Sequence, residues 1–247
     1  MKARNGLLTL GVAGCLGLIG ASAAAANTVT VGSPLTAALS SAPFGEQVTA
    51  VNTALPEAGA LVGAPANGTI VSWKVIGASG GPLKIRVVHP VGGGRFTGAG
   101  KASSGPITGS GVLTFNTNLS IKQGDLIGID PTNDTDMISA VDGVPGSQAI
   151  FFFPTLADGG PGVAPLLTVT GEIGFNAQVL LNCVVPKLKG KKIGAARRAL
   201  SAAGCDPPKV KRKKGQGGKF VGKQNPRAGK EIPSDRAVVL KLRPKKT

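Results

Sequence analysis

Hydrophobic and polar residues alternate in short stretches over the first three quarters of the chain, which is the period of a half-buried β-strand. The stretches are rich in Val, Ile, Thr and Phe and are separated by clusters of Gly, Pro, Asn and Asp, which are typical turn residues. The strands predicted in this way cover residues 69–76, 83–90, 111–116, 126–130, 137–141, 149–153, 167–172 and 175–181. Eight or more strands in about 155 residues predict a mainly β fold, an antiparallel β-sandwich with a jelly-roll-like arrangement.

Aromatic residues within these strands give two further expectations. Trp73 is in phase with Val71 and Val75, so we expect the three side chains on one buried face. The three phenylalanines at 151–153 must place at least one ring on each face of a strand. An exposed ring there would mark a contact surface or lie under a loop.

The apolar period changes to that of a helix near residue 191. Gly204 stands where the C-cap of this helix is expected. Short extended segments are predicted around it at 183–188, 209–213 and 237–242. We therefore expect a small α+β module in which the helix covers one face of a sheet. The residues at helical spacing are Ile193, Ala196, Ala199, Leu200 and Ala203.

The N-terminus has the order of a secretory signal peptide. Lys2 and Arg4 precede an apolar run at 7–20, and small residues follow at 21–26. The run is shorter than the roughly 20 residues that a membrane span needs, which favours a cleaved signal. We predict cleavage after Ala26, with Ala23 as an earlier alternative. Val12-Ala13-Gly14-Cys15 also resembles the lipobox of bacterial lipoproteins. Because the apolar run continues beyond Cys15, ordinary cleavage is favoured over lipidation.

Charge divides the rest of the chain into two parts. Residues 27–182 carry six basic and nine acidic residues, a net charge of −3, whereas residues 183–247 carry twenty and three, a net charge of +17. This asymmetry predicts a β-sandwich domain at 27–182, here called the β-domain, and a basic module at 183–247. After removal of the predicted signal peptide, the chain keeps two cysteines, Cys183 and Cys205. In an exported protein, an even number of cysteines favours a disulfide.

The basic module contains the motif residues of a known family in the same order and spacing. The motif begins with Val-Pro and a glycine. A helix with spaced Ala and Leu comes next and ends in Gly. A Gln-x-Pro-x-x-Gly turn and a last strand follow. The residues are Val185, Pro186, Gly190, Ala196, Leu200, Gly204, Gln224, Pro226 and Gly229. This segment, about a quarter of the chain, resembles a PASTA domain of bacterial penicillin-binding proteins and serine/threonine kinases. The resemblance implies recognition of peptidoglycan fragments or β-lactams. The family often occurs as tandem copies on membrane proteins, whereas one copy is present here.

The charge of the module points independently to a polyanionic partner. Outside a bacterial cell, such partners are wall carboxylates, teichoic-type phosphates and acidic lipid headgroups. We expect no specific nucleic-acid binding, because Phe220 is the only aromatic residue of the module on which a base would stack. The predicted contacts with a polyanion or the wall are Lys209, Lys211, Arg212, Lys213, Lys214, Lys245 and Lys246.

The chain shows no constellation of catalytic residues. His89 is the only histidine, and no nucleophile elbow, metalloprotease helix or phosphate-binding loop is present. The acid-rich segment at 130–136 has oxygen ligands of the kind that calcium prefers, but Asx-turns explain the same residues and are favoured. One tryptophan and no tyrosine make a sugar-stacking platform difficult to build. We predict no enzyme activity, no cofactor and no metal ion.

Together these patterns predict a secreted, wall-associated bacterial protein. The PASTA-like module would attach to peptidoglycan or anionic wall polymers and display the β-domain. The alternative is an envelope hydrolase or carbohydrate-binding protein whose site lies in the β-domain, with the module as targeting. Adhesion through exposed strand edges is a third interpretation. The ligand of the β-domain and the oligomeric state stay open.

Overall fold

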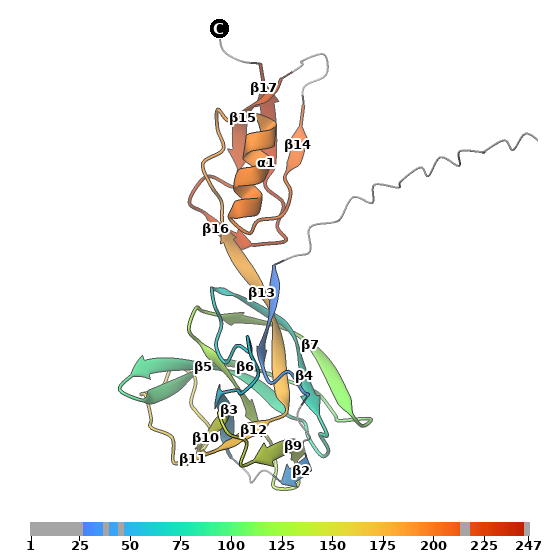
Figure 1. The fold of residues 1–247 in the computed structure, drawn as a ribbon, viewed down its shortest axis with the longest axis vertical. Coiled ribbons are helices and arrows are strands. Elements are labelled where there is room, and N and C mark those ends of the chain that lie inside the picture. The colour runs from blue at the N-terminus through green and yellow to red at the C-terminus, as the bar shows by residue number, and fades with distance from the viewer. Residues whose placement is uncertain (1–26, 37–39, 44–46, 213–217, 245–247) are drawn as a thin grey trace, which may run out of the picture.

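Two antiparallel sheets of the β-domain lie face to face in a computed structural model, which describes residues 27–36, 40–43, 47–212 and 218–244. The first sheet has the order β1 (Thr28–Gly32), β13 (Phe175–Val184), β4 (Gly68–Ile76) and β7 (Val112–Ile121). The second has the order β11 (Leu167–Val169), β10 (Gln148–Phe152), β3 (Thr49–Ala54), β8 (Leu126–Asp130), β5 (Lys84–Gly92) and β6 (Arg95–Ser103). A third sheet consists of β12 (Gly171–Ile173), β9 (Met137–Asp142) and β2 (Ser40–Pro43) (Figure 1). The predicted signal peptide and Cys15 lie outside the described residues.

The core of the sandwich is formed by aliphatic and aromatic side chains from both large sheets. Ile70 and Phe175 come from one sheet and Ile129 from the other, and all are fully buried. Trp73 is also completely buried, as predicted, and its ring packs against Phe115 with a centroid distance of 4.6 Å. The mainly β, antiparallel architecture expected from the alternating pattern is therefore confirmed.

A β-bulge corrects one expectation for β4. Val71 was expected on the face of Trp73, but consecutive residues of β13 pair with Ser72 and Ile70, which leaves Val71 as an extra residue in β4. A bulge inserts one residue into the alternation, so residues before and after it fall out of phase. Ile70 therefore occupies the core position and Val71 is only partly buried.

The segment predicted as one strand at 167–172 is two strands in different sheets. β11 pairs with β10, and β12 pairs with β9, so the chain changes sheets at Thr170. Four other strands, β1, β2, β3 and β6, were not predicted. The three phenylalanines divide as expected. Phe152 is buried in a small cluster and Phe151 packs partly against the main core, whereas Phe153 is exposed.

The basic module consists of one helix on one face of a three-stranded sheet. The helix α1 spans Ile193–Ala202, and the sheet has the order β14 (Lys209–Lys211), β17 (Val239–Arg243) and β15 (Phe220–Asn225). Ala196 and Leu200 of the helix are buried in one cluster with Leu240 of β17. The predicted helix and last strand are present, and β15 is a strand that the sequence did not predict.

Gly204 ends the helix as expected. Its φ is +69°, a conformation that glycine adopts without steric cost. The backbone N–H of Gly204 donates to the carbonyl of Ser201, and that of Cys205 donates to the carbonyl of Leu200, each at 3.0 Å. These two bonds are the Schellman pattern that satisfies the last carbonyls of a helix.

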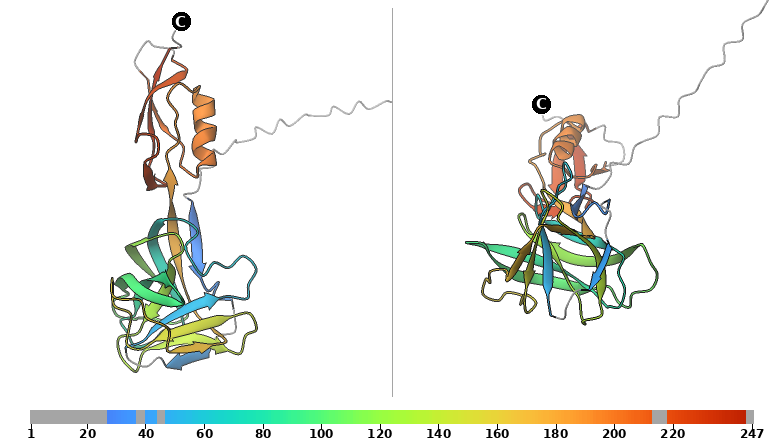
Figure 2. Two further views of the ribbon diagram at one scale, coloured as in Figure 1. Left: turned by 90° about the vertical axis from the view of Figure 1, so that its left-hand side faces the viewer. Right: turned by 60° about the horizontal axis from the view of Figure 1, so that its bottom comes forward.

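The strand β13 leads from the sandwich directly into the module. Most of it pairs with β1 and β4, and its last residues, Asn182 to Val184, pair with β16 (Glu231–Pro233). Leu181 belongs to the sandwich core, whereas Cys183 belongs to the core of the module. The module stands at one end of the sandwich along this strand (Figures 1 and 2).

Cys183 and Cys205 form the predicted disulfide, with Cα atoms 5.4 Å apart. The bond joins the last part of β13 to Cys205, the residue after Gly204. It closes a loop across 22 residues. Among the residues that the structure describes, no helix has the length and hydrophobicity to cross a lipid bilayer.

Replacing both cysteines, Cys183→Ser and Cys205→Ser, is expected to destabilise the module by about 3 kcal/mol, because the loop of the unfolded chain is no longer closed. The helical circular dichroism signal of α1 should melt earlier than in the parent protein. Trp73, the only tryptophan, reports the sandwich, so its fluorescence transition should move less. An unchanged helical transition would contradict this role of the disulfide.

Candidate functional site

The outer face of the module's sheet, opposite the helix, carries a row of lysines. In the register of the sheet, Lys211 of β14 lies beside Lys241 of β17, and Lys241 lies beside Lys223 of β15. All three side chains are exposed, while the residues that alternate with them face the helix. We call these three residues the lysine row. None of the ion pairs found among the described residues involves them.

Like charges on directly opposed strand positions repel one another and destabilise the sheet. Neighbouring strands lie about 4.8 Å apart, so the row extends over about 10 Å. Lys209 and Arg243 add further positive charge to the same strands. A hollow of about 370 Å³ lies here, lined by Lys211, Lys223, Gln224, Asn225, Val239 and Lys241. The arrangement is suited to an anion, which would relieve the repulsion.

The predicted polyanion contacts divide between this face and residues that are not described. Lys209 and Lys211 belong to β14, and Arg212 follows them, and all three are exposed. Lys213, Lys214, Lys245 and Lys246 lie outside the described residues. Sequence reasoning missed Lys223 and Lys241, which lie near Lys211 only through strand pairing. The segment at 237–242, which contains Lys241, was predicted to be extended, but its partner strand β15 was not predicted.

Gln224 holds the start of the module to β15. Its side-chain oxygen accepts hydrogen bonds from the backbone N–H of Leu188 at 2.7 Å and of Lys189 at 3.2 Å. Its side-chain nitrogen donates to the carbonyl of Pro186 at 3.0 Å. This glutamine thus fixes the turn that precedes the helix.

The other motif residues also build the framework of the module. Val185 is buried, and its carbonyl accepts from the backbone N–H of Gly229 at 2.8 Å. Gly190 and Gly229 have positive φ values, and Pro226 follows β15 after a cis peptide bond. The motif residues therefore position the sheet, and the charged residues around them form its outer surface.

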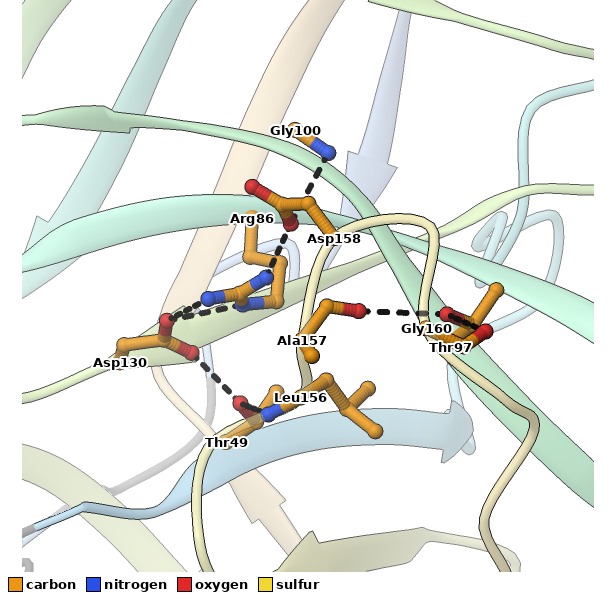
Figure 3. A network of polar contacts seen from close by, with 9 residues as sticks. All are labelled: Thr49, Arg86, Thr97, Gly100, Asp130, Leu156, Ala157, Asp158 and Gly160. Atoms are coloured by element: carbon orange, nitrogen blue, oxygen red, sulfur yellow. Dashed lines mark hydrogen bonds and ion pairs between the residues drawn. The ribbon is translucent and has the colours of Figure 1, made fainter.

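Arg86 is the centre of a buried polar network in the β-domain. Its side chain is fully buried, and Nε donates to Oδ2 of Asp130 at 2.8 Å. Another nitrogen of the guanidinium pairs with Asp158, which lies on the loop after β10 (Figure 3). Asp130 also accepts from Thr49 Oγ1 at 2.8 Å, and Thr49 accepts from the backbone of Leu156 at 3.0 Å. These contacts join β5, β8 and β3 to that loop and are structural in character.

The remaining candidate chemistry of the β-domain is also used in local contacts. His89 is paired through Nδ1 with Asp125 at 2.6 Å. In the acid-rich segment, Asn133 Oδ1 accepts from the backbone N–H of Thr135 at 3.1 Å, as expected of an Asx-turn. Asp136 accepts from the backbone N–H of Thr132 and of Asn133. No group of three or more metal-ligating side chains was found in the described parts of the chain.

Glu172 of β12 is a carboxyl with a clearly shifted pKa. It is buried, and burial raises the pKa of its side chain above the ordinary value. The hydrogen bond from Ser33 Oγ partly lowers this pKa, and the charge of Glu57 raises it further. Its other oxygen, Oε2, has no hydrogen-bond partner among the described residues.

Asp130 and Asp158 provide a matched test of the Arg86 network. Asp130→Asn is expected to destabilise the sandwich by about 3 kcal/mol, because it removes the buried one of the two carboxylates that pair with the buried guanidinium of Arg86. Asp158→Asn should cost less than about 1 kcal/mol, because its side chain is 41% exposed. Denaturant unfolding followed by Trp73 fluorescence measures the stability of both variants. Equal losses of stability would contradict the greater role assigned to Asp130 in the Arg86 network.

The raised pKa of Glu172 predicts a pH dependence of stability. The folded protein binds this proton more tightly than the unfolded chain does. The free energy of unfolding therefore falls as the pH rises from the ordinary carboxyl range through the raised pKa. Glu172→Gln should reduce this fall and leave stability near pH 4 almost unchanged. Thermal unfolding of both proteins across pH 4–8 checks this, and parallel profiles would refute it.

Comparison with protein families supports the resemblance found in the motif residues. The family model of the PASTA domain matches residues 184–243. Neither the curated proteins nor the solved structures gave a match to the chain. Domains of this family bind peptidoglycan-type ligands, so the match associates the protein with the cell envelope. Residues 184–243, which carry the lysine row and the helix that supports it, are a PASTA domain.

Proposed function

We propose that this protein is a secreted, envelope-associated binding protein whose PASTA domain attaches to peptidoglycan or to the anionic polymers of the wall. The lysine row carries the proposal. Three lysines in adjacent register, with no ion pair to another described residue, are unfavourable for the sheet alone, and they are suited to a ligand with several negative charges. The β-domain would be displayed at the surface by this attachment.

Attachment through the lysine row would be electrostatic and multivalent. A wall phosphate or carboxylate between two lysines accepts charge-assisted hydrogen bonds from both ammonium groups. The net charge of +17 on residues 183–247 attracts such polymers from a distance. Exposed ion pairs are individually weak, so affinity requires several contacts at once and decreases with added salt. The polymer is thus held without being turned over.

Two features of the chain support display of the β-domain. Secretion would use the predicted signal peptide at 1–26. The strand β13 then connects the sandwich to the attached PASTA domain without an intervening loop. The buried charges of the sandwich, centred on Arg86, are engaged in structural contacts, which favours binding over hydrolysis.

The double variant Lys223→Gln/Lys241→Gln tests the site within residues 27–247 of the chain. We expect roughly tenfold weaker binding to purified cell-wall sacculi, because two exposed ion pairs contribute about 1–2 kcal/mol together. The same variant should unfold at a slightly higher temperature, because it removes an opposed pair of like charges. Sedimentation with sacculi and thermal unfolding measure the two effects.

The control variant is Arg197→Gln/Arg198→Gln, which removes the same charge from exposed positions of the helix. It should retain most of the binding. Equal losses of binding in both variants would mean that net charge alone binds the wall. Unchanged binding of Lys223→Gln/Lys241→Gln would exclude the lysine row as the binding site. Release of soluble wall fragments by the parent protein would favour the hydrolase alternative.

A further inference from the structure

The β-domain contains a cavity that the proposed attachment does not use. It has a volume of about 270 Å³ and lies between β10 and β11 of the six-stranded sheet and β9 and β12 of the three-stranded sheet. Its wall is largely apolar and includes Ala149, Phe153, Leu167 and Val169. A cavity lined mainly by apolar side chains with few polar groups is the usual form of a small-molecule site.

Two large apolar side chains of this wall are exposed to solvent. Phe153 is 46% exposed and Leu167 is 47% exposed. Phe153 follows the end of β10, and Leu167 begins β11, which is the edge strand of its sheet. Neighbouring apolar residues that stay exposed on a protein surface mark a contact site when they are grouped around a hollow. The body of a ligand would therefore cover these two side chains.

One of the polar residues in the wall of the cavity is a buried carboxyl. Glu172 lines the cavity and is 1% exposed. Ser33 donates to one of its oxygens, while Oε2 has no hydrogen-bond partner within the part of the chain that the structure describes. A buried acceptor without a donor loses its hydration and gains nothing in return. A hydrogen-bond donor on a ligand would supply the missing partner.

The charges around the cavity determine the kind of ligand. Asp142, at an exposed position, is the other carboxylate of the wall. No lysine, arginine or histidine occurs among the described residues that line the cavity. An anionic ligand would meet two carboxyl groups and no cation, whereas a cation would meet only favourable charges.

We propose that this cavity binds a small molecule with an apolar, ring-sized body and one amino group. The amine donates to Oε2 of Glu172, and the apolar body packs against Phe153 and Leu167. The inference goes beyond the attachment of the PASTA domain and does not depend on it. It assigns to the β-domain a ligand of a class different from the wall polymers.

Three probes of similar shape test the assignment on residues 27–247: phenethylamine, phenethyl alcohol and phenylacetate. Amide chemical-shift titrations at pH 7 locate and measure the binding of each. Phenethylamine should saturate near the millimolar range, which is usual for so small a ligand, with shifts in β10, β11 and β12. The alcohol should bind about tenfold more weakly, and phenylacetate should not saturate. Failure of phenethylamine to saturate, or equal binding of phenylacetate, would overturn the proposal.

Glu172→Gln tests the carboxyl directly, because it preserves shape and removes the charge. The variant should bind phenethylamine no more tightly than phenethyl alcohol. The exposed Asp134→Asn, which lies away from the cavity wall, is the control and should retain the preference for the amine. Trp73 fluorescence verifies that both variants are folded. A preference for the amine that persists in Glu172→Gln would show that another group binds it and would contradict the site.

Discussion

The strand β13 is the constraint on which both parts of the molecule depend. Its backbone pairs with β1 and β4 in the sandwich and then with β16 in the PASTA domain. Side chains of the same strand enter two different cores, with Leu181 in one and Cys183 in the other. The disulfide of Cys183 then fixes the end of the helix to this strand. The lysine row is consequently connected to the sandwich by paired backbone and not by a flexible linker.

The sequence predicted the strands that have clear alternation and long apolar side chains. The bounds of β8 were predicted to the residue, and those of β4, β5, β9 and β10 nearly so. β3 and β6 were missed because small residues and glycines dominate them, and such segments become strands through pairing with neighbours. The bulge in β4 could not be predicted either, since it is a property of the pairing with β13 and not of one strand.

The candidate site was only partly predictable, for a physical reason. The motif predicted the PASTA domain because its residues are the framework: Gln224 fixes a turn, and Gly204 ends a helix. Charge counting predicted a polyanion partner and the lysines of β14. The row itself arises from the register of three strands that are distant in the sequence. The oxygen of Glu172 that lacks a partner among the described residues likewise has no counterpart in any local pattern.

The most direct test of attachment compares binding of residues 27–247 to intact sacculi and to sacculi stripped of their anionic polymers, across a series of salt concentrations. The account predicts saturable binding at low salt that weakens steadily as salt is added, because several charge contacts are screened together. Binding that persists on stripped sacculi would identify peptidoglycan as the ligand, and binding that is lost on them would identify the anionic polymers. Absence of binding to both preparations at low salt would contradict the account.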